Sequence, residues 1–106
     1  MMKGIVILMM VLFAISISGC APPSGDDALI NECKAACQAA LAQGRNLSAG
    51  PCIIDPMSDA GWVCDIAHSP REAIDNLPEN QCSAYRNGTA KHFIELTPDC
   101  GFIQAR

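Results

Sequence analysis

The sequence predicts an α+β domain in which an N-terminal helix packs on a small antiparallel sheet, with a second short helix and three disulfides. Three observations support this: an alanine-rich stretch bounded by helix start and stop residues, short apolar runs separated by turn residues, and six cysteines spread over the same region. Residues 27–106 hold only seventeen large apolar side chains, so we expect the disulfides to contribute much of the stability.

The first expected element of this domain is a helix over residues 27–43. Asp26 or Asp27 can cap its start, alanines fill its interior, and Gly44 suits the position just beyond its end. One face carries residues spaced four apart, which we expect to point into the core: Leu29, Cys33, Cys37 and Leu41.

Four short strands are expected to follow, over residues 52–54, 62–68, 90–97 and 102–105. In the second strand, the side that holds Trp62 and Cys64 is expected to be buried, with Asp65 on the other side. Between the second and third strands, a capping-box pattern at residues 69–72 predicts one helical turn through Ile74, and residues 78–87 predict the second short helix.

Residues 1–19, ahead of the domain, are typical of an export signal. Lys3 is the only charged residue before Asp26, and residues 4–15 form a twelve-residue apolar run. Such a run is too short to cross ~30 Å of hydrocarbon as a helix that rises ~1.5 Å per residue. We therefore expect a removable signal peptide rather than a membrane span.

The tetrapeptide Ile17-Ser18-Gly19-Cys20 ends this segment and resembles the lipobox of prokaryotic lipoproteins. That pattern has an aliphatic residue, two small residues that admit the signal peptidase, and a cysteine whose thiol takes the lipid. The resemblance implies cleavage before Cys20 and attachment to its thiol of a diacylglycerol that carries fatty acids such as palmitate. It places the domain outside the cytoplasm, on the cell membrane or the outer membrane. Residues 20–26, with two prolines, are then a flexible tether.

With Cys20 assigned to lipid, an even number of cysteines is left for disulfides: Cys33, Cys37, Cys52, Cys64, Cys82 and Cys100. The expected pairs are Cys33–Cys64, Cys37–Cys52 and Cys82–Cys100. Both helix cysteines should face the hairpin that carries Cys52 and Cys64, and cysteines one helical turn apart rarely reach disulfide geometry with each other. A Cys52–Cys64 bridge within the hairpin is the alternative.

The spacing Cys33-x-x-x-Cys37 resembles half of the cystine-stabilised αβ motif, but the C-x-C strand of that motif is missing. A structural zinc site needs a second close pair of ligands, so no metal is expected. The segments GPC at 50–52, WVCDIAH at 62–68 and HFIEL at 92–96 resemble short cysteine-rich exported proteins of archaea and bacteria. This resemblance implies a compact extracytoplasmic domain and no known activity.

The net charge of the chain limits the kinds of molecule that it can bind. Without residues 1–19, six basic residues stand against eleven acidic ones, which gives a net charge of −5. This acidity argues against nucleic acid and against a basic surface for anionic lipid headgroups. The expected partners are the membrane, through lipidated Cys20, and another envelope protein. No cofactor is expected, and the glycosylation sequons at Asn46 and Asn87 fall in expected loops.

Polar residues concentrate between positions 65 and 87, where a cross-linked scaffold can position loops for binding. The candidate binding residues are Asp65, His68, Arg71, Asn76, Tyr85 and Arg86. The favoured function is therefore non-enzymatic binding of a protein or another envelope component. The alternatives are a rigid-loop inhibitor of a hydrolase or an envelope defence protein, and a small metal-binding or hydrolytic protein that uses His68 or His92. An enzyme is least expected, because no catalytic motif stands out.

Overall fold

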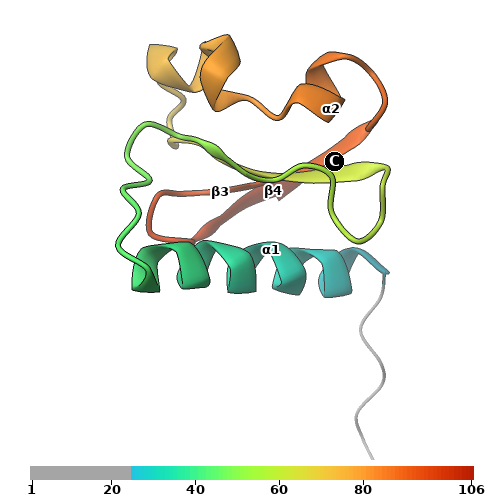
Figure 1. Cartoon of the computed structure of the whole chain (residues 1–106), viewed down its shortest axis with the longest axis horizontal. Helices are drawn as coiled ribbons and strands as arrows, with labels where there is room; N and C mark the ends of the chain where they lie inside the picture. The colour runs from blue at the N-terminus through green and yellow to red at the C-terminus, as the bar shows by residue number, and fades with distance from the viewer. Residues whose placement is uncertain (1–24) are drawn as a thin grey trace, which may run out of the picture.

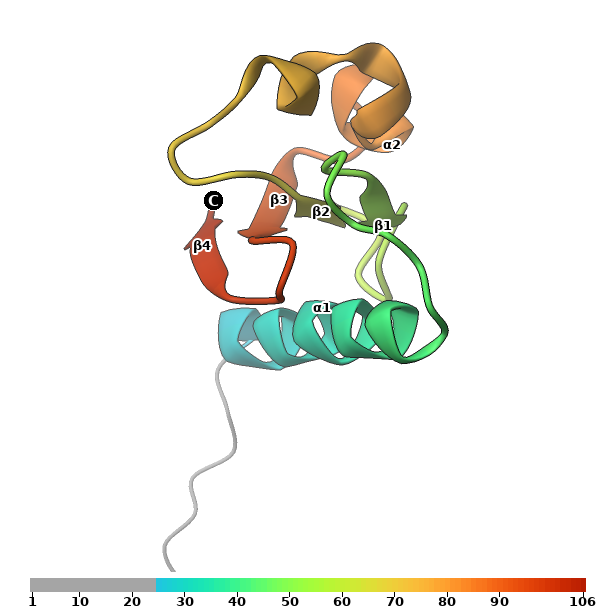
Figure 2. The same ribbon diagram turned by 90° about the vertical axis from the view of Figure 1, so that its left-hand side faces the viewer.

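The computed structural model describes residues 25–106 and arranges them in three layers (Figures 1 and 2). One long helix covers one face of a four-stranded sheet, and a segment of short helices covers the other face. The elements, in chain order, are α1 (Gly25–Ala42), β1 (Cys52–Ile54), β2 (Trp62–Ile66), the 3-10 helices η1 (Ala73–Asn76) and η2 (Pro78–Asn80), α2 (Ser83–Arg86), β3 (His92–Leu96) and β4 (Phe102–Ala105). The predicted α+β class, with its three disulfides, is confirmed.

Helix α1 forms where the sequence predicts it, and Gly44 follows its end with a positive φ of 84°. The buried face is made of Leu29, Cys33, Cys37 and Ala40, so the prediction of Leu41 in the core is wrong. The reason is the helical period. At about 100° per residue, Leu41 has rotated about 120° away from Leu29, whereas Ala40 has returned to within about 20° of it.

The sheet has the order β1-β2-β3-β4 and is mixed rather than antiparallel throughout. The β1–β2 and β3–β4 pairs are antiparallel, whereas β2 and β3 run parallel with Trp62 beside His92 and Asp65 beside Glu95. Parallel neighbours need a crossover connection, and residues 67–91 supply it. We call this segment the crossover; it carries η1, η2 and α2 (orange in Figure 1).

Because side chains alternate along a strand, the central strands contribute to a separate apolar cluster on each face. Cys64, Ile66, Ile94 and Leu96 pack with α1. Val63 packs on the crossover side with Cys82 and Ala90. All five residues of β2 are buried. The strand is therefore covered on both faces, and not only on the side of Trp62 as expected.

The crossover is less helical than the sequence predicts. The helical turn expected from a capping box at residues 69–72 is absent; η1 begins later, with Glu72 as its N-cap and Asp75 completing the capping box. The helix expected over residues 78–87 is divided into η2 and the single turn of α2.

The disulfides join α1 and the crossover to the sheet. Cys33–Cys64 links α1 to β2, as predicted, with the sulfur atoms 1.96 Å apart. The other two expected pairs are wrong: Cys37 bonds to Cys100, in the turn between β3 and β4, and Cys52 bonds to Cys82 in the crossover.

A bulge in β1 explains this difference. The register places Cys52 opposite Asp65 but Ile54 opposite Cys64, so the bulge turns Cys52 and Ile54 towards different faces. Cys52 therefore packs on the crossover side, out of reach of α1, while Ile54 packs against the α1 core.

Cys20, the expected signal peptide over residues 1–19 and most of the expected tether over residues 20–26 lie outside the described residues. Among residues 25–106, no helix combines the length and the apolar character needed to cross a membrane.

Candidate functional site

A pocket of about 250 Å³ lies on the face of the sheet opposite α1, between the strands and the crossover. It is slightly smaller than the ~300–1,000 Å³ of typical small-molecule sites, which suits a small ligand or one inserted side chain. Its polar side chains are Asp65, Arg71, Gln81, Glu95 and Gln104. Its apolar wall is formed by Val63, Cys82, Tyr85 and Phe93.

Asp65 is the unusual residue of this pocket. Its side chain projects from β2 on the crossover side, only 8% of the residue is exposed, and Oδ1 has no hydrogen-bond partner among the described residues. Burial raises the pKa of Asp65 from its ordinary value of 3.8 to about 8, and the negative charge of Glu95 adds to the effect. The Ile66 backbone and Arg71 offset this only in part, so Asp65 holds a proton at neutral pH.

Glu95, the neighbour of Asp65 across the β2–β3 ladder, has both carboxylate oxygens occupied. Arg71 Nη1 donates to Oε2 at 2.7 Å, and Gln104 Nε2 donates to Oε1 at 2.8 Å. Arg71 is held in turn by Asn76, whose Oδ1 accepts from Arg71 Nε at 2.8 Å. Arg71 is therefore committed to Glu95 and the crossover, whereas Oδ1 of Asp65 is buried without a hydrogen-bond partner among the described residues.

The apolar end of the pocket is formed by an aromatic pair. The rings of Tyr85, in α2, and Phe93, in β3, meet edge to face with their centroids 5.1 Å apart. Tyr85 is 44% exposed, so this wall continues to the protein surface. The pocket thus joins a polar interior to an aromatic edge.

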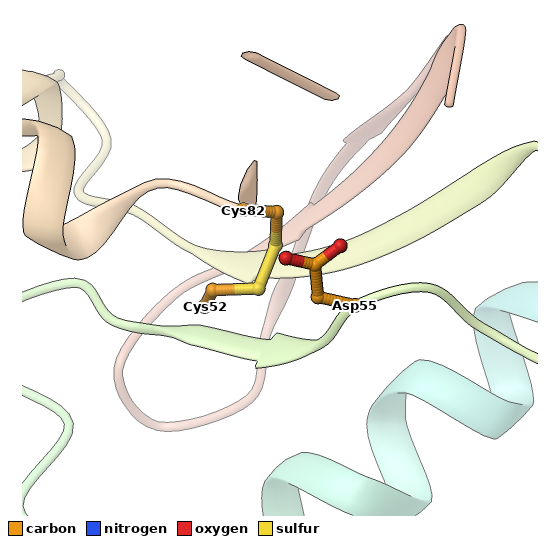
Figure 3. A group of neighbouring side chains, drawn as sticks. All are labelled: Cys52, Asp55 and Cys82. Atoms are coloured by element: carbon orange, nitrogen blue, oxygen red, sulfur yellow. A yellow bond between two sulfur atoms is a disulfide. The ribbon is translucent and has the colours of Figure 1, made fainter. Parts of the chain in front are cut away.

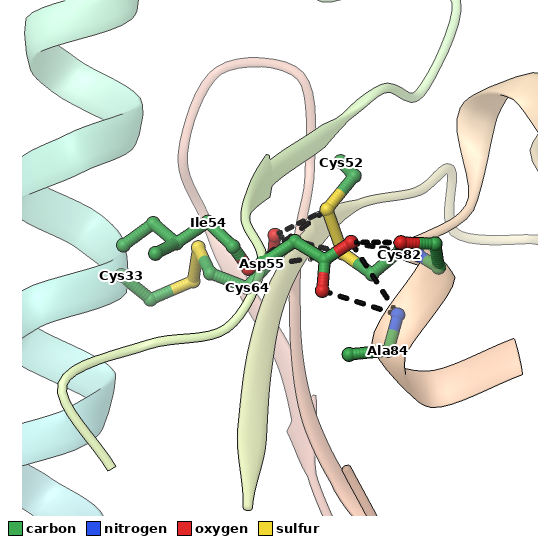
Figure 4. The surroundings of a disulfide bond; sticks show 8 residues. Cys33, Cys52, Ile54, Asp55, Cys64, Cys82 and Ala84 are labelled. Carbon is green, nitrogen blue, oxygen red and sulfur yellow. Dashed lines mark hydrogen bonds between the residues drawn. A yellow bond between two sulfur atoms is a disulfide. The ribbon is translucent and has the colours of Figure 1, made fainter. Parts of the chain in front are cut away.

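The crossover is fastened beside the pocket by the Cys52–Cys82 disulfide and by Asp55 (Figure 3). The Asp55 carboxylate accepts from Ser83 N at 2.7 Å, from Ser83 Oγ at 2.8 Å and from Ala84 N at 3.1 Å (Figure 4). Asp55 therefore caps α2 from a different element. Cys52, Asp55 and Cys82 also form the one group of close metal-ligand types among residues 25–106, but the disulfide occupies both sulfur atoms.

A second polar cluster surrounds Asp75, which is 1% exposed. Burial alone would raise the pKa of Asp75, but it is outweighed by hydrogen bonds from the backbone N–H groups of Glu72 and His68 and from the His68 ring, so the pKa is lowered. Because an ionised carboxylate only accepts, the His68 Nδ1 that lies 2.9 Å from Oδ1 is the donor. Gly50, with a φ of 73°, packs so closely on Asp75 that a side chain there would collide with it.

The two histidines do not share a site. His92 lies beside Trp62 at the start of the parallel pair, and the two rings stack with centroids 4.7 Å apart. His68 follows the other end of β2 and is held by Asp75. Neither histidine lines the pocket, so the structure does not bring His68, His92 and Asp65 together as a joint site.

Three of the six candidate binding residues line the pocket: Asp65, Arg71 and Tyr85. Asn76 acts indirectly by holding Arg71, while His68 and Arg86 are not among the lining residues. Sequence reasoning missed Glu95 and Gln104, which line the pocket from the neighbouring strands β3 and β4. The signal available for Glu95 was its position between the apolar residues of the HFIEL strand.

Asn46 and Asn87, the two sequon asparagines, are exposed in loops, and each side-chain oxygen accepts from the backbone two residues further on. Comparison of the chain with protein-family models, with curated proteins and with solved structures found no match.

Proposed function

We propose that the chain is the precursor of an exported lipoprotein, anchored by lipid on Cys20, whose folded domain binds a partner protein or another envelope component without catalysis. The observation that carries the binding role is the pocket between the sheet and the crossover, which is lined by Asp65, whose Oδ1 is buried without a hydrogen-bond partner among the described residues. A buried polar group without a partner is costly to the fold, and such groups are characteristic of functional sites.

The proposed location rests on the N-terminal sequence, and the fold is compatible with it. Three disulfides in a small domain are typical of proteins that fold outside the reducing cytoplasm. The lipobox resemblance at residues 17–20 then supplies an anchor.

The surface of the crossover supports a protein partner. Three large apolar side chains are exposed there: Ile74, Leu77 and Tyr85. Exposed apolar groups around a pocket favour binding to another macromolecule, whose side chain can enter the pocket while its surface covers the rim.

Asp65 and Glu95 lie side by side across the β2–β3 ladder, and many hydrolases also use a pair of carboxyl groups. Catalysis would need the second carboxylate to act as a base or nucleophile. Glu95 has both oxygens engaged by Arg71 and Gln104, which favours a binding role for the pair.

The anchor is tested by the mass of the mature protein. We expect protein extracted from membranes to begin at Cys20 and to carry a diacylglycerol on its thiol. Cys20→Ser should abolish the lipid and release the domain from the membrane fraction. Wild-type protein that lacks lipid and leaves the membrane fraction in buffer alone would contradict the proposal.

The pocket is tested by filling it. We expect Gln81→Trp, which places a bulky ring on the pocket wall, to remove a partner that co-purifies with the wild-type protein from solubilised envelopes. Glu79→Trp is the matched control, because Glu79 is exposed two residues away and does not line the pocket. A partner retained equally by both variants would argue against binding through the pocket.

A further inference from the structure

The side chains that line the pocket indicate which chemical class of ligand it can bind. Its charged groups are two carboxyls and one guanidinium, Asp65, Glu95 and Arg71. The guanidinium is bonded to Glu95, Asn76 and the carbonyl of Asp75, so it is not available to Asp65. The Asp65 carboxyl receives no hydrogen bond from this guanidinium, so it can accept from a donor that enters the pocket.

We propose that the pocket binds a primary ammonium group on an unbranched carbon stem, which donates to the carboxyl group of Asp65 while its stem lies against Tyr85 and Phe93. This inference rests on the proposed function, since it names the ligand class for the same pocket. An ammonium group offers three donors and no acceptor, so it can satisfy Asp65 without competing with Arg71 for its partners.

The apolar wall fits the stem of such a ligand. The carbon chain of a lysine or an alkylamine buries itself along apolar surface while its charged end reaches a polar group. The edge-to-face pair of Tyr85 and Phe93 offers that surface, and aromatic rings add a favourable electrostatic interaction with the cation. A volume of about 250 Å³ admits one unbranched chain.

Protonation of Asp65 couples this binding to pH. Its pKa of about 8 means that the carboxyl is neutral below this pH, and a cation must displace the proton. The charged groups that act on Asp65 are Glu95 from β3 and Arg71 and Asp75 from the crossover. A lysine-type amine stays charged up to pH ~10, so affinity should rise with pH by up to about tenfold per unit between pH 5 and pH 8.

The test uses the ¹⁵N-labelled full-length protein in micelles of an uncharged detergent, titrated with Nα-acetyl-lysine methylamide. We expect amide shifts in β2 and β3 near the pocket, an affinity that rises with pH, and little response to the norleucine analogue, which lacks the ammonium group. Cadaverine is the second probe: shifts with both amines identify the ammonium group, and shifts with the lysine probe alone identify a peptide side chain as its source.

Asp65→Asn keeps the shape of the side chain and removes its charge, and should weaken binding of the lysine probe by roughly 10- to 100-fold. Glu79→Gln is the control, because it removes an exposed carboxylate outside the pocket and should leave binding unchanged. Equal binding of the lysine and norleucine probes, or tighter binding at low pH, would overturn the ammonium proposal while retaining a binding pocket. If neither probe shifts the pocket residues, and Gln81→Trp leaves partner capture intact, both proposals fail.

Discussion

Replacing Cys37 and Cys100 together by alanine is expected to lower the free energy of unfolding by about 4 kcal/mol. This bridge closes the longest loop of the three, with a sequence separation of 63, so its loss releases the most chain entropy in the unfolded state. It also joins α1 to the β3–β4 turn, and both cysteines are buried. Urea denaturation of the oxidised variant and wild type measures the difference.

The Cys52→Ala/Cys82→Ala variant provides the comparison. Its loop spans only 30 residues, so loop closure alone predicts a somewhat smaller loss, about 3.6 kcal/mol. The Cys52–Cys82 bridge fastens the crossover beside the pocket, so this variant should also lose binding of the lysine probe. The Cys37→Ala/Cys100→Ala variant should retain that binding under conditions where it is folded. A loss of less than about 1 kcal/mol for Cys37 and Cys100 would show that the apolar core is sufficient without this cross-link.

The stability of the domain is expected to fall as the pH rises from about 4 to about 8. The folded-state pKa of Asp65, about 8, lies above its ordinary value of 3.8, so the folded state binds the proton more tightly throughout that interval. The stabilisation from this group is complete below pH ~4 and is lost as the pH rises through 8. Its contribution to the free energy of unfolding should decline by about 1.4 kcal/mol per pH unit.

Asp65→Asn removes this titration and should flatten the profile, leaving the variant more stable than wild type at pH 8. The measurement is the urea midpoint at several pH values, in one buffer series of constant ionic strength. Asp75 is the internal contrast: its pKa is lowered, so its stabilisation is present above its unfolded pKa and is lost only as the pH falls into the acid range. An unchanged slope in Asp65→Asn would show that another group causes the dependence.

Features that depend on local sequence could be predicted well. The bounds of α1 follow from its acidic first turn, its alanine content and Gly44, and the inward direction of Cys33 and Cys37 follows from helical spacing. The strands were recognised from short apolar runs, because alternation and turn residues act over a few positions.

Features that depend on pairing between distant segments could not be predicted. The residues of the crossover do not reveal whether the chain returns parallel or antiparallel to β2, since both routes satisfy the same turn signals. The bulge between Cys52 and Ile54 is a single-residue irregularity, yet it changes the face on which Cys52 lies and therefore two of the three disulfides.

In the candidate site too, some residues could be predicted from the local sequence and others could not. Asp65 and Arg71 could be selected from their polar neighbourhood, but the contribution of Glu95 depends on the β2–β3 register that places it beside Asp65. Gln104 joins through the β3–β4 register, beside Glu95. No sequence pattern within β3 or β4 specifies which residues become cross-strand neighbours. The pairing of Asp65 with Glu95 can therefore be seen only in the tertiary structure.

The layer order gives the domain a direction relative to the proposed anchor. Four residues lie between Cys20 and Gly25, and the five peptide bonds span at most ~18 Å when fully extended, so the proposed anchor would keep the start of α1 close to the bilayer surface. The crossover lies on the opposite side of the sheet from α1 (Figure 2), and the pocket lies between the crossover and the sheet. In the proposed anchored form, the pocket would therefore lie across the sheet from the helix to which the tether is joined.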